Sequence, residues 1–467
     1  MIDYTTISRV YFIGIGGIGM SALARYFLQK NAEVYGYDRA PSQLSRQLEA
    51  EGAVIHYEDD ITQLCRQAEL VIYTPAIPAS HNEMNWYKDH EYLLAKRSDV
   101  LSHVTANTFN ICIAGTHGKT TISAMVAHIL RDSGYGCQAL LGGISSNYQT
   151  NFWNTNNDVT VVEADEYDRS FLKLSPDIAV ISAMDADHLD IYHTVENMRQ
   201  AFESFATKIK PGGYLYTRFG IGGSFSSDNH ISYSLQNSAA DIYGVNITMQ
   251  HGGYTFDVIA KGWVITDLQL SMGGMHNVEN AIVSVAIARQ LGIDTQKIRE
   301  AIAGFKGVKR RFEYLISPSE AQQLRNDVVY IDDYAHHPEE LKALINSAKS
   351  LFRDRKCTVV FQPHLFTRTR DLAADFAQAL DPADEILLLP IYPAREQPID
   401  GVTSVLILDK LANKNSSVVS PAQLLEYING EYLKTAADIP QGNLLITAGA
   451  GSIDSLTEPI KKILLQS

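Results

Sequence analysis

The chain is poor in cysteine and has no long apolar run, and each shortage excludes a class of protein. Its four cysteines, Cys65, Cys112, Cys137 and Cys357, lie far apart in 467 residues with no C-x-x-C spacing. Neither a zinc site nor a disulfide framework is indicated, so we expect a reducing, cytoplasmic location. No apolar stretch approaches the roughly 20 residues that cross a bilayer, and the first residues, MIDYTTISRVYFIG, lack the pattern of a signal peptide. We therefore expect no membrane partner.

Basic residues are also too few for a protein whose main partner is nucleic acid. The chain has 39 Lys and Arg against 53 Asp and Glu, a formal net charge of -14. This excess repels a polyanion, so any anionic ligand must be bound locally. The 45% share of hydrophobic residues is that of a globular protein. The length predicts about two to four domains at roughly 100 to 200 residues each.

A strand, a turn and a helix recur at the start of successive segments. Residues 9–38, RVYFIGIGGIGMSALARYFLQKNAEVYGYD, read as strand, helix and strand, which is a βαβ unit. The pattern restarts at NTFNICIAG and again after KGVKRR, where FEYLI and DVVYIDDYAHHP begin another alternating series. We therefore predict an α/β protein with a Rossmann-like parallel sheet in residues 1–107, a P-loop ATPase-type mixed sheet in 108–311, and a Rossmann-like α/β domain in 312–467.

The first glycine turn, GIGGIGM, satisfies the pattern G-x-G-x-x-G with Gly14, Gly16 and Gly19, and Asp38 ends the next strand. Backbone N–H groups and a helix N-terminus bind a pyrophosphate, whether it belongs to NAD or to a nucleotide sugar. By itself the turn leaves both hypotheses open, together with a purely structural turn.

A second loop, AGTHGKTTISAM, resembles a nucleotide-binding P-loop that has been shortened. The common pattern G-x-x-x-x-G-K-[ST] requires a glycine at position 113, where Ile113 stands. Gly118 permits close approach of the backbone, Lys119 supplies a cation for the phosphates, and Thr120 supplies a hydroxyl for Mg²⁺. The loop therefore predicts ATP and Mg²⁺ as ligands.

Acidic and basic side chains follow four predicted strands, at VVEADEYD, MDADHLD, DDYAHHP and FQPHLFTRTRD. Each cluster by itself could be a solvated or capped loop. Beside a phosphate loop that needs Mg²⁺, however, the first two favour a joint metal site. The last two lie at strand ends, where α/β sheets bind ligands.

The ordered set GIGGIGM, GTHGKTT, EADE, DH, HNVEN, RRF, DDYAHHP and FQPHLFTRT resembles the Mur ligase family of peptidoglycan synthesis over the full chain. The family's phosphate loop lacks the first glycine in the same way. The resemblance implies an ATP-dependent ligase, a cytoplasmic monomer or homodimer. It would join L-alanine to the lactoyl carboxylate of UDP-N-acetylmuramate through an acyl phosphate, with ATP and Mg²⁺.

Two alternatives are kept. A family member that adds a murein tripeptide to UDP-N-acetylmuramate gains weight from Tyr167, because many alanine-adding members have serine there. Leu365 also replaces an arginine of some members, although FQPHLFTRTRD and FLKLSPDIAVIS follow the alanine-adding pattern. The alternative from another class is an NAD-dependent dehydrogenase that uses GIGGIG.

The resemblance assigns roles to individual residues of this sequence. The UDP end of the sugar is expected at Gly14, Ile15, Gly16, Gly17, Ile18, Gly19, Met20 and Asp38. ATP is expected at Gly115, Thr116, His117, Gly118, Lys119, Thr120, Thr121, Asn277, Asn280, Arg311 and Asp333. Mg²⁺ is expected at Thr120, Glu163 and His188, and the alanine and carboxylate pocket at Tyr334, His336, His364 and Arg368. Catalysis is expected to depend on Lys119, Glu163, His188 and Arg311.

Overall fold

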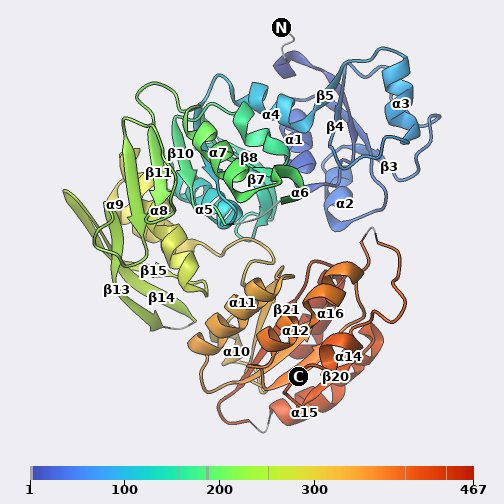
Figure 1. The fold of residues 1–467 in the computed structure, drawn as a ribbon, viewed down its shortest axis with the longest axis vertical. Helices are drawn as coiled ribbons and strands as arrows, with labels where there is room; N and C mark the ends of the chain where they lie inside the picture. The colour runs from blue at the N-terminus through green and yellow to red at the C-terminus, as the bar shows by residue number, and fades with distance from the viewer. Residues whose placement is uncertain are drawn as a thin grey trace. The chain divides into compact units, whose positions relative to one another are not determined.

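Three sheets follow one another along the chain in the computed structural model (Figure 1). The structure describes residues 4–155, 157–185, 189–250, 252–394, 396–437 and 439–466. The chain divides into two compact units. The first unit holds residues 1–244, 258–265 and 279–302, and the second holds residues 245–257, 266–278 and 303–467.

The first sheet has five strands in the order β3-β2-β1-β4-β5. All four strand pairings are parallel, and helices lie in the β1–β2, β2–β3 and β4–β5 connections. The central position of β1 places the glycine turn at the middle of the sheet's carboxyl edge. The strands are β1 (Arg9–Ile13), β2 (Glu33–Tyr37), β3 (Val54–His56), β4 (Leu70–Tyr73) and β5 (Leu94–Lys96), and the helices are η1 (Tyr4–Thr6), α1 (Ile18–Gln29), α2 (Gln43–Ala50), α3 (Asn82–Asp89) and α4 (Arg97–Thr105).

The second sheet has ten strands in the order β15-β14-β13-β12-β11-β10-β6-β9-β7-β8. Its strand β6 pairs in parallel with β10 and β9, and all of β6 except Phe109 is buried. The edge strand β8 is antiparallel to β7, so the sheet is mixed. The strands are β6 (Phe109–Ala114), β7 (Gln138–Ser145), β8 (Thr150–Asn154), β9 (Val159–Glu163), β10 (Ile178–Ile181), β11 (Tyr214–Arg218), β12 (His230–Ser234), β13 (Ile242–Gln250), β14 (Gly253–Ala260) and β15 (Trp263–Leu270). The helices are α5 (Lys119–Asp132), η2 (Tyr167–Lys173), α6 (Leu189–Tyr192), α7 (Val195–Ala206), α8 (Met275–Gln290) and α9 (Thr295–Gly304).

The third sheet has six strands in the order β16-β17-β21-β18-β19-β20, and only the pairing of β16 with β17 is antiparallel. The sequence HHPEE explains where α11 begins, because proline fits the first helical turn and two glutamates favour a helix N-terminus. The strands are β16 (Glu313–Ile316), β17 (Val328–Asp333), β18 (Lys356–Phe361), β19 (Glu385–Leu388), β20 (Ser416–Val418) and β21 (Asn443–Ala448). The helices are α10 (Pro318–Ala321), α11 (Pro338–Leu351), α12 (Phe366–Leu380), α13 (Val405–Leu408), α14 (Pro421–Tyr427), η3 (Ile428–Tyr432), α15 (Leu433–Ala436) and α16 (Asp454–Leu465).

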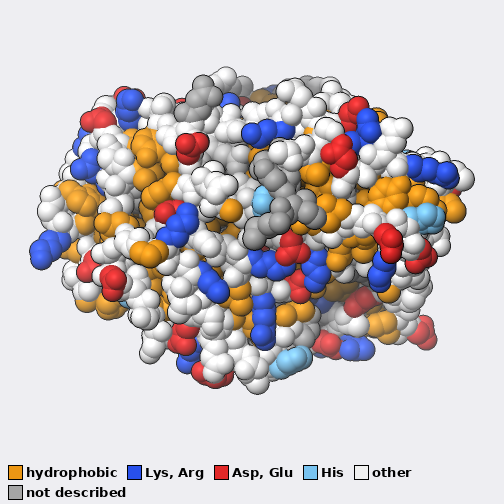
Figure 2. All heavy atoms as spheres, turned by 90° about the horizontal axis from the view of Figure 1, so that it is seen from above, with side chains coloured by type: hydrophobic (Ala, Val, Ile, Leu, Met, Phe, Trp, Pro, Cys, Tyr) orange, Lys and Arg blue, Asp and Glu red, His pale blue; other side chains and the backbone are white. Residues whose placement is uncertain are grey.

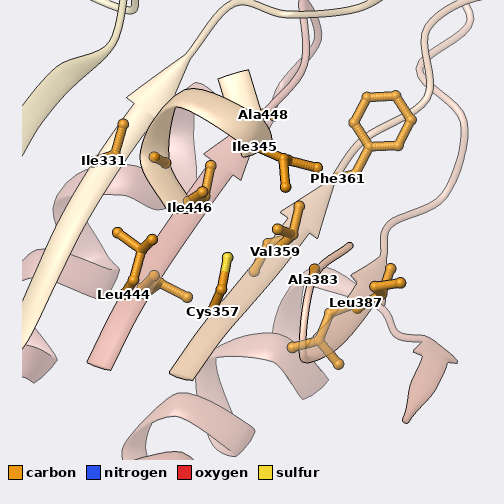
Figure 3. Close-up of a cluster of buried hydrophobic side chains, with 14 of the residues drawn as sticks. Ile331, Ile345, Cys357, Val359, Phe361, Ala383, Leu387, Leu444, Ile446 and Ala448 are labelled. Atoms are coloured by element: carbon orange, nitrogen blue, oxygen red, sulfur yellow. The ribbon is translucent and has the colours of Figure 1, made fainter. Parts of the chain in front are cut away.

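The third sheet has its own hydrophobic core, formed by β17, β18 and β21 with the helices that cover them (Figure 3). Figure 3 shows labelled side chains of these three central strands, with Leu444 of β21 and Val359 of β18 nearest to Cys357. Burial raises the pKa of the Cys357 thiol to about 12. This cysteine is therefore a core residue, as the absence of a metal-type spacing predicts.

The first two sheets share one core. Phe12 and Phe27 of the first sheet's layer belong to the same buried cluster as Cys112 and Phe152 of the second. The rings of Tyr26 in α1 and Phe152 in β8 lie 6.2 Å apart, edge to face. Helix α1 is therefore packed from both sides, which holds the glycine turn firmly against the second sheet.

The fold confirms the predicted class: an α/β chain with a parallel first sheet, a mixed central sheet and a C-terminal sheet that is parallel apart from β16. None of the described helices combines the length and the apolar character that a bilayer crossing needs. On the face shown in Figure 2, acidic and basic side chains are interspersed rather than gathered by sign.

Candidate active site

Asp38 and the backbone close the glycine turn after β1. The N–H groups of Gly14 and Ile15 both donate to the carbonyl oxygen of Tyr37. The N–H of Gly16 donates to Oδ2 of Asp38 over 2.7 Å. A Cβ on Gly16 would lie 2.8 Å from that oxygen, so a larger residue there would displace the carboxylate of Asp38. Asp38 therefore shapes the turn, and its contact with a uridine nucleotide stays a prediction.

The remaining residues of the turn lead into α1. Gly17 caps the helix and is exposed, as is Ile18, whereas Ile15 and Met20 are buried in the core. Gly19 is half-buried. The exposed backbone at the helix N-terminus is the part of this segment that suits a diphosphate.

A buried asparagine from β8 fastens α1 to the second sheet. Nδ2 of Asn151 donates to the carbonyl oxygen of Ile18 over 2.7 Å and to Oγ of Ser21 over 3.0 Å. Its Oδ1 accepts from the guanidinium of Arg25, which also pairs with Glu51 at 2.8 Å. Asn151 is fully buried. Sequence reasoning missed this side chain, because the contact spans more than 120 positions and carries no local motif.

The shortened phosphate loop lies between β6 and α5. Gly115 and Gly118 have φ values of 131° and 84°, which other residues adopt only under strain. A Cβ on Gly115 would lie 2.3 Å from Oγ of Ser182, so the loop packs directly on the segment after β10. Oγ of Ser182 in turn donates to the carbonyl oxygens of His117 and Ala114. Ser182 is thus a second residue that sequence reasoning missed.

Lys119 is held by its own loop and by Glu166. Its ammonium lies 2.7 Å from the carbonyl oxygen of Gly115 and 2.7 Å from Oε1 of Glu166. Glu166 is fully buried, and burial raises the pKa of its carboxyl while Lys119 opposes that rise. The ion pair fixes the cation at the carboxyl end of β6. The sequence places Glu166 in an acidic cluster but does not identify this pairing.

Glu163 ends β9 directly beside β6, with Ile113 as its partner in the register. A Cβ on Gly142 of β7 would lie 2.1 Å from its Oε2 and 2.5 Å from its Cδ. Gly142 therefore makes the space that this carboxylate occupies. Glu163 and the half-buried Thr120 offer oxygen ligands of the type that Mg²⁺ takes, so these residues suit the ion.

The segment after β10 is tied to the phosphate loop. The N–H of Thr116 donates to the carbonyl oxygen of Ala183 over 3.0 Å, and the N–H of Asp185 donates to Oγ1 of Thr116 over 3.1 Å. Nε2 of the exposed His117 lies 3.7 Å from Asp185. The expected metal ligand His188 lies outside the described residues, as does Asp187.

The two asparagines of HNVEN lie three positions apart near the start of α8. A Cβ on Gly118 would lie 3.0 Å from Oδ1 of Asn280, which places Asn280 beside the phosphate loop. Nδ2 of Asn277 donates to the carbonyl oxygen of Gly273 over 2.7 Å. Asn280 therefore lies beside the phosphate loop within the first unit.

In the second unit, Arg310 and Arg311 differ in their surroundings. Nε of Arg310 lies 3.0 Å from Oδ2 of the buried Asp332, and its guanidinium also donates to the carbonyl oxygen of Gly449. Arg311, by contrast, is exposed. Asp333 accepts the N–H groups of Phe312 and Ala335, each over 2.7 Å. Arg310 and Asp332 thus form a structural pair, whereas the guanidinium of the exposed Arg311 lies 5.8 Å from the ring centroid of Tyr334.

The four residues predicted for the alanine and carboxylate pocket gather at the carboxyl ends of β17 and β18. The ring centroids of Tyr334 and His336 lie 5.2 Å apart, and those of His336 and His364 lie 5.8 Å apart. Nη1 of Arg368 lies 3.5 Å from the carbonyl oxygen of His336. Tyr392 stacks on His364 with centroids 5.8 Å apart, a contact that the sequence did not indicate.

Burial makes both histidines of this group poor proton acceptors. Burial, together with the nearby His336 and Arg368, lowers the pKa of His364 to about 4. Burial also lowers the pKa of His336. Both rings are therefore neutral at pH 7, and Arg368 supplies the positive charge. Such a group suits a carboxylate ligand.

Asp59, His81 and Glu83 bring three potential metal ligands within 4.8 Å in the first unit. Asp59 accepts the N–H groups of Asn82 and Glu83 and so caps α3. Glu83 accepts a hydrogen bond of 2.6 Å from the hydroxyl of Tyr11. Because these carboxylates already serve the fold as acceptors, we interpret the cluster as the anchor of α3.

Comparison with known proteins places the whole chain in one family. Residues 9–108 match the Mur ligase family, catalytic domain; residues 113–288 match the Mur ligase middle domain; and residues 310–451 match the Mur ligase, glutamate ligase domain. The chain is 45% identical to a UDP-N-acetylmuramate--L-alanine ligase of Cytophaga hutchinsonii, across 98% of this chain and 97% of that protein. It is 43% identical to the protein of the same name from Parabacteroides distasonis, across 99% of this chain and 98% of that protein.

Solved structures agree in fold. The crystal structure of a UDP-N-acetylmuramate-alanine ligase from Thermotoga maritima has a TM-score of 0.83 at 26% identity, covering 98% of this chain and 99% of that one. A murein peptide ligase from Psychrobacter arcticus has a TM-score of 0.68 at 22% identity, covering 98% of each chain, and shows the fold alone. The glycine turn, the shortened phosphate loop and the histidine and arginine group all lie within the matched segments. The chain belongs to the Mur ligase family.

Proposed function

We infer that this protein is an ATP-dependent ligase that joins L-alanine to the lactoyl carboxylate of UDP-N-acetylmuramate in the cytoplasm. The observation that carries the proposal is the match of 43% to 45% identity, over nearly the full length, to ligases named for that reaction. The NAD-dependent alternative has no comparable support, because these relatives over nearly the full length are named as ligases.

The proposed work is divided along the chain. Residues 1–107 would bind the UDP end of the sugar, residues 108–311 would bind ATP, and residues 312–467 would carry the alanine and carboxylate pocket. Asn277, Asn280, Arg311 and Asp333 complete the proposed ATP contacts.

The first chemical step makes the carboxylate reactive. A carboxylate oxygen attacks the γ-phosphorus of ATP, the bond to the β-γ bridging oxygen breaks, and an acyl phosphate and ADP result. Both reactants are anions, so Lys119 and Arg311 are needed to offset their charge. Thr120 and Glu163 would hold Mg²⁺, which supplies further positive charge to the phosphates when bound.

The second step forms the amide. The neutral amine of L-alanine attacks the acyl carbon, and the tetrahedral intermediate expels inorganic phosphate. Arg368 suits the carboxylate of the amino acid, since it is the cation of its group. His364 is a weak base because its pKa lies near 4, so we assign it to binding rather than to removal of the amine proton.

Isotope transfer tests the proposal directly. UDP-N-acetylmuramate labelled with ¹⁸O in the lactoyl carboxylate is mixed with ATP, L-alanine and the full chain. We expect phosphate release only with all substrates present, and one ¹⁸O atom in each phosphate. Lys119→Met should abolish release and leave UDP-N-acetylmuramate binding intact, while the exposed Lys208→Met serves as the matched control. Turnover with a murein tripeptide but not with L-alanine would support the paralogous activity instead.

A further inference from the structure

Arg97 is a cation beside the glycine turn that no sequence motif singled out. It is the first residue of α4, which follows the edge strand β5. A Cβ on Gly19 would lie 3.0 Å from Nη1 of Arg97 and 3.3 Å from its Cζ. The guanidinium thus lies against the bare backbone of α1, in the first turn of that helix. Gly19, the last glycine of GIGGIG, makes room for this arginine.

Asp165 holds the other side of the guanidinium. Its Oδ2 lies 3.7 Å from Nη2 of Arg97, and the two side chains are 37% and 21% exposed. The second oxygen of Asp165 accepts the N–H of Tyr167 over 3.1 Å. Among the described residues, this loose ion pair is the contact that opposes the charge of Arg97. The N–H groups of Arg97 therefore remain available to a stronger acceptor.

The start of α4 is fixed rather than loose. The ammonium of Lys173 contacts the carboxylate of Asp99 and lies 2.9 Å from Oγ of Ser98. Oγ of Ser102 donates to the carbonyl oxygen of Lys173 over 2.7 Å. Arg97 therefore projects from an anchored helix end, which limits the entropy lost when it binds a ligand.

The local charge at the turn favours a cation beside a bound diphosphate. Residues 14–20 contain no Lys or Arg, and Asp38 places a carboxylate against Gly16. A diphosphate on this turn would meet the positive end of α1 but also the charge of Asp38. Arginine matches phosphate oxygens with two parallel N–H donors and is charged at any working pH.

We propose that Arg97 binds the diphosphate of the nucleotide sugar at the glycine turn and that Asp165 positions it there. The proposal rests on the function inferred above and extends it to two residues of the sugar-nucleotide site. The competing explanation is that Arg97 and Asp165 merely tie α4 to the segment after β9.

Binding of a ligand series separates the two explanations. Affinities of the full-length protein for UDP-N-acetylmuramate, UDP and uridine are measured by calorimetry for the wild type and for Arg97→Gln, Arg97→Lys and Asp165→Asn. We expect Arg97→Gln to lower the affinity for both diphosphate ligands by about tenfold or more, since a charge-assisted hydrogen bond is lost. The affinity for uridine should not change. Arg97→Lys should recover part of the loss, and Asp165→Asn should cost less than Arg97→Gln. The exposed Arg46→Gln, in α2, is the matched control.

A second variant tests the same geometry with the arginine retained. Gly19→Ala places a methyl group 3.0 Å from Nη1, so the guanidinium must shift, and UDP should bind more weakly. Unchanged ATP affinity and melting temperature report that each variant is folded. The proposal is overturned if Arg97→Gln and the wild type bind UDP with equal affinity. It is also overturned if Arg97→Gln and Asp165→Asn each lose as much affinity for uridine as for UDP. If the wild type itself does not bind UDP-N-acetylmuramate, the proposed function fails first.

Discussion

Gly142→Ala is the substitution that most directly tests the proposed role of Glu163. The new methyl group would lie 2.1 Å from Oε2 of Glu163, whereas ordinary contact begins at 3.4 Å. The carboxylate must therefore move by about 1.3 Å. The backbone of Gly142 does not have a positive φ, so alanine itself adds no strain there.

The expected effect follows from how little a metal site tolerates. Ligand distances in such sites hold to within about 0.2 Å, so a shift of this size removes Glu163 from any ion bound with Thr120. Changes around metal ligands cost about 10- to 100-fold in metal affinity or activity, or roughly 1.4 to 2.8 kcal/mol. The free energy of unfolding should change by less than about 1 kcal/mol, because glycine to alanine also restricts the unfolded chain.

The assay is the initial rate of phosphate release as Mg²⁺ is titrated at fixed substrates. Gly142→Ala should need at least about tenfold more Mg²⁺ for half-maximal rate, and UDP-N-acetylmuramate should bind as in the wild type. Gly430→Ala is the matched control, since a Cβ there meets nothing within 4 Å. An unaltered Mg²⁺ dependence in Gly142→Ala would falsify the assignment of Glu163 as a metal ligand.

Three further predictions concern stability, each measured by urea unfolding. Lys119→Met removes the ammonium that lies 2.7 Å from the buried carboxylate of Glu166, and it should lower the free energy of unfolding by about 3 kcal/mol. The double variant Lys119→Met with Glu166→Gln should recover most of that stability. Simple additivity of the two changes would contradict the ion pair. Asn151→Leu deprives the guanidinium of Arg25 and the start of α1 of their partner and should cost about 2 kcal/mol or more, so a neutral effect would refute the anchoring role. The pKa of His364 lies near 4 in the folded state and near 6.5 when exposed, so the stability that its neutral ring contributes is present above pH 6.5 and is lost as the pH falls through 4. His364→Gln should therefore lose less stability over that pH range than the wild type. Identical profiles of stability against pH would count against the buried neutral ring.

Local patterns were enough to identify the elements that carry the proposed site. The βαβ unit of residues 9–38 and the strand before GTHGKT are strongly patterned, and the structure has strands and helices at both. The family prediction, made from the order of short motifs, is confirmed by matches to all three parts of the chain. The roles of single site residues stay predictions, and His188 lies outside the described residues.

Contacts between distant segments could not be predicted in the same way. Gly19 satisfies a nucleotide-turn pattern, yet in the fold its missing side chain admits Arg97, 78 positions later. The resemblance carried by the motif RRF implied a role for Arg311, while Arg310 forms the buried pair with Asp332. Nothing in the local sequence distinguishes these partners, because the identity of a neighbour depends on how strands are ordered.

The sequence by itself determined the class of chemistry. A shortened phosphate loop, a glycine turn and ordered polar strand ends are local features, and backbone geometry and charge act over a few residues. The tertiary structure decided which side chains restrain them: Glu166 on Lys119, Gly142 beside Glu163, and Asn151 under α1. These pairings arise only when β6, β7, β8 and β9 are brought side by side and α1 packs on them, because burial makes a single polar partner or a missing Cβ decisive.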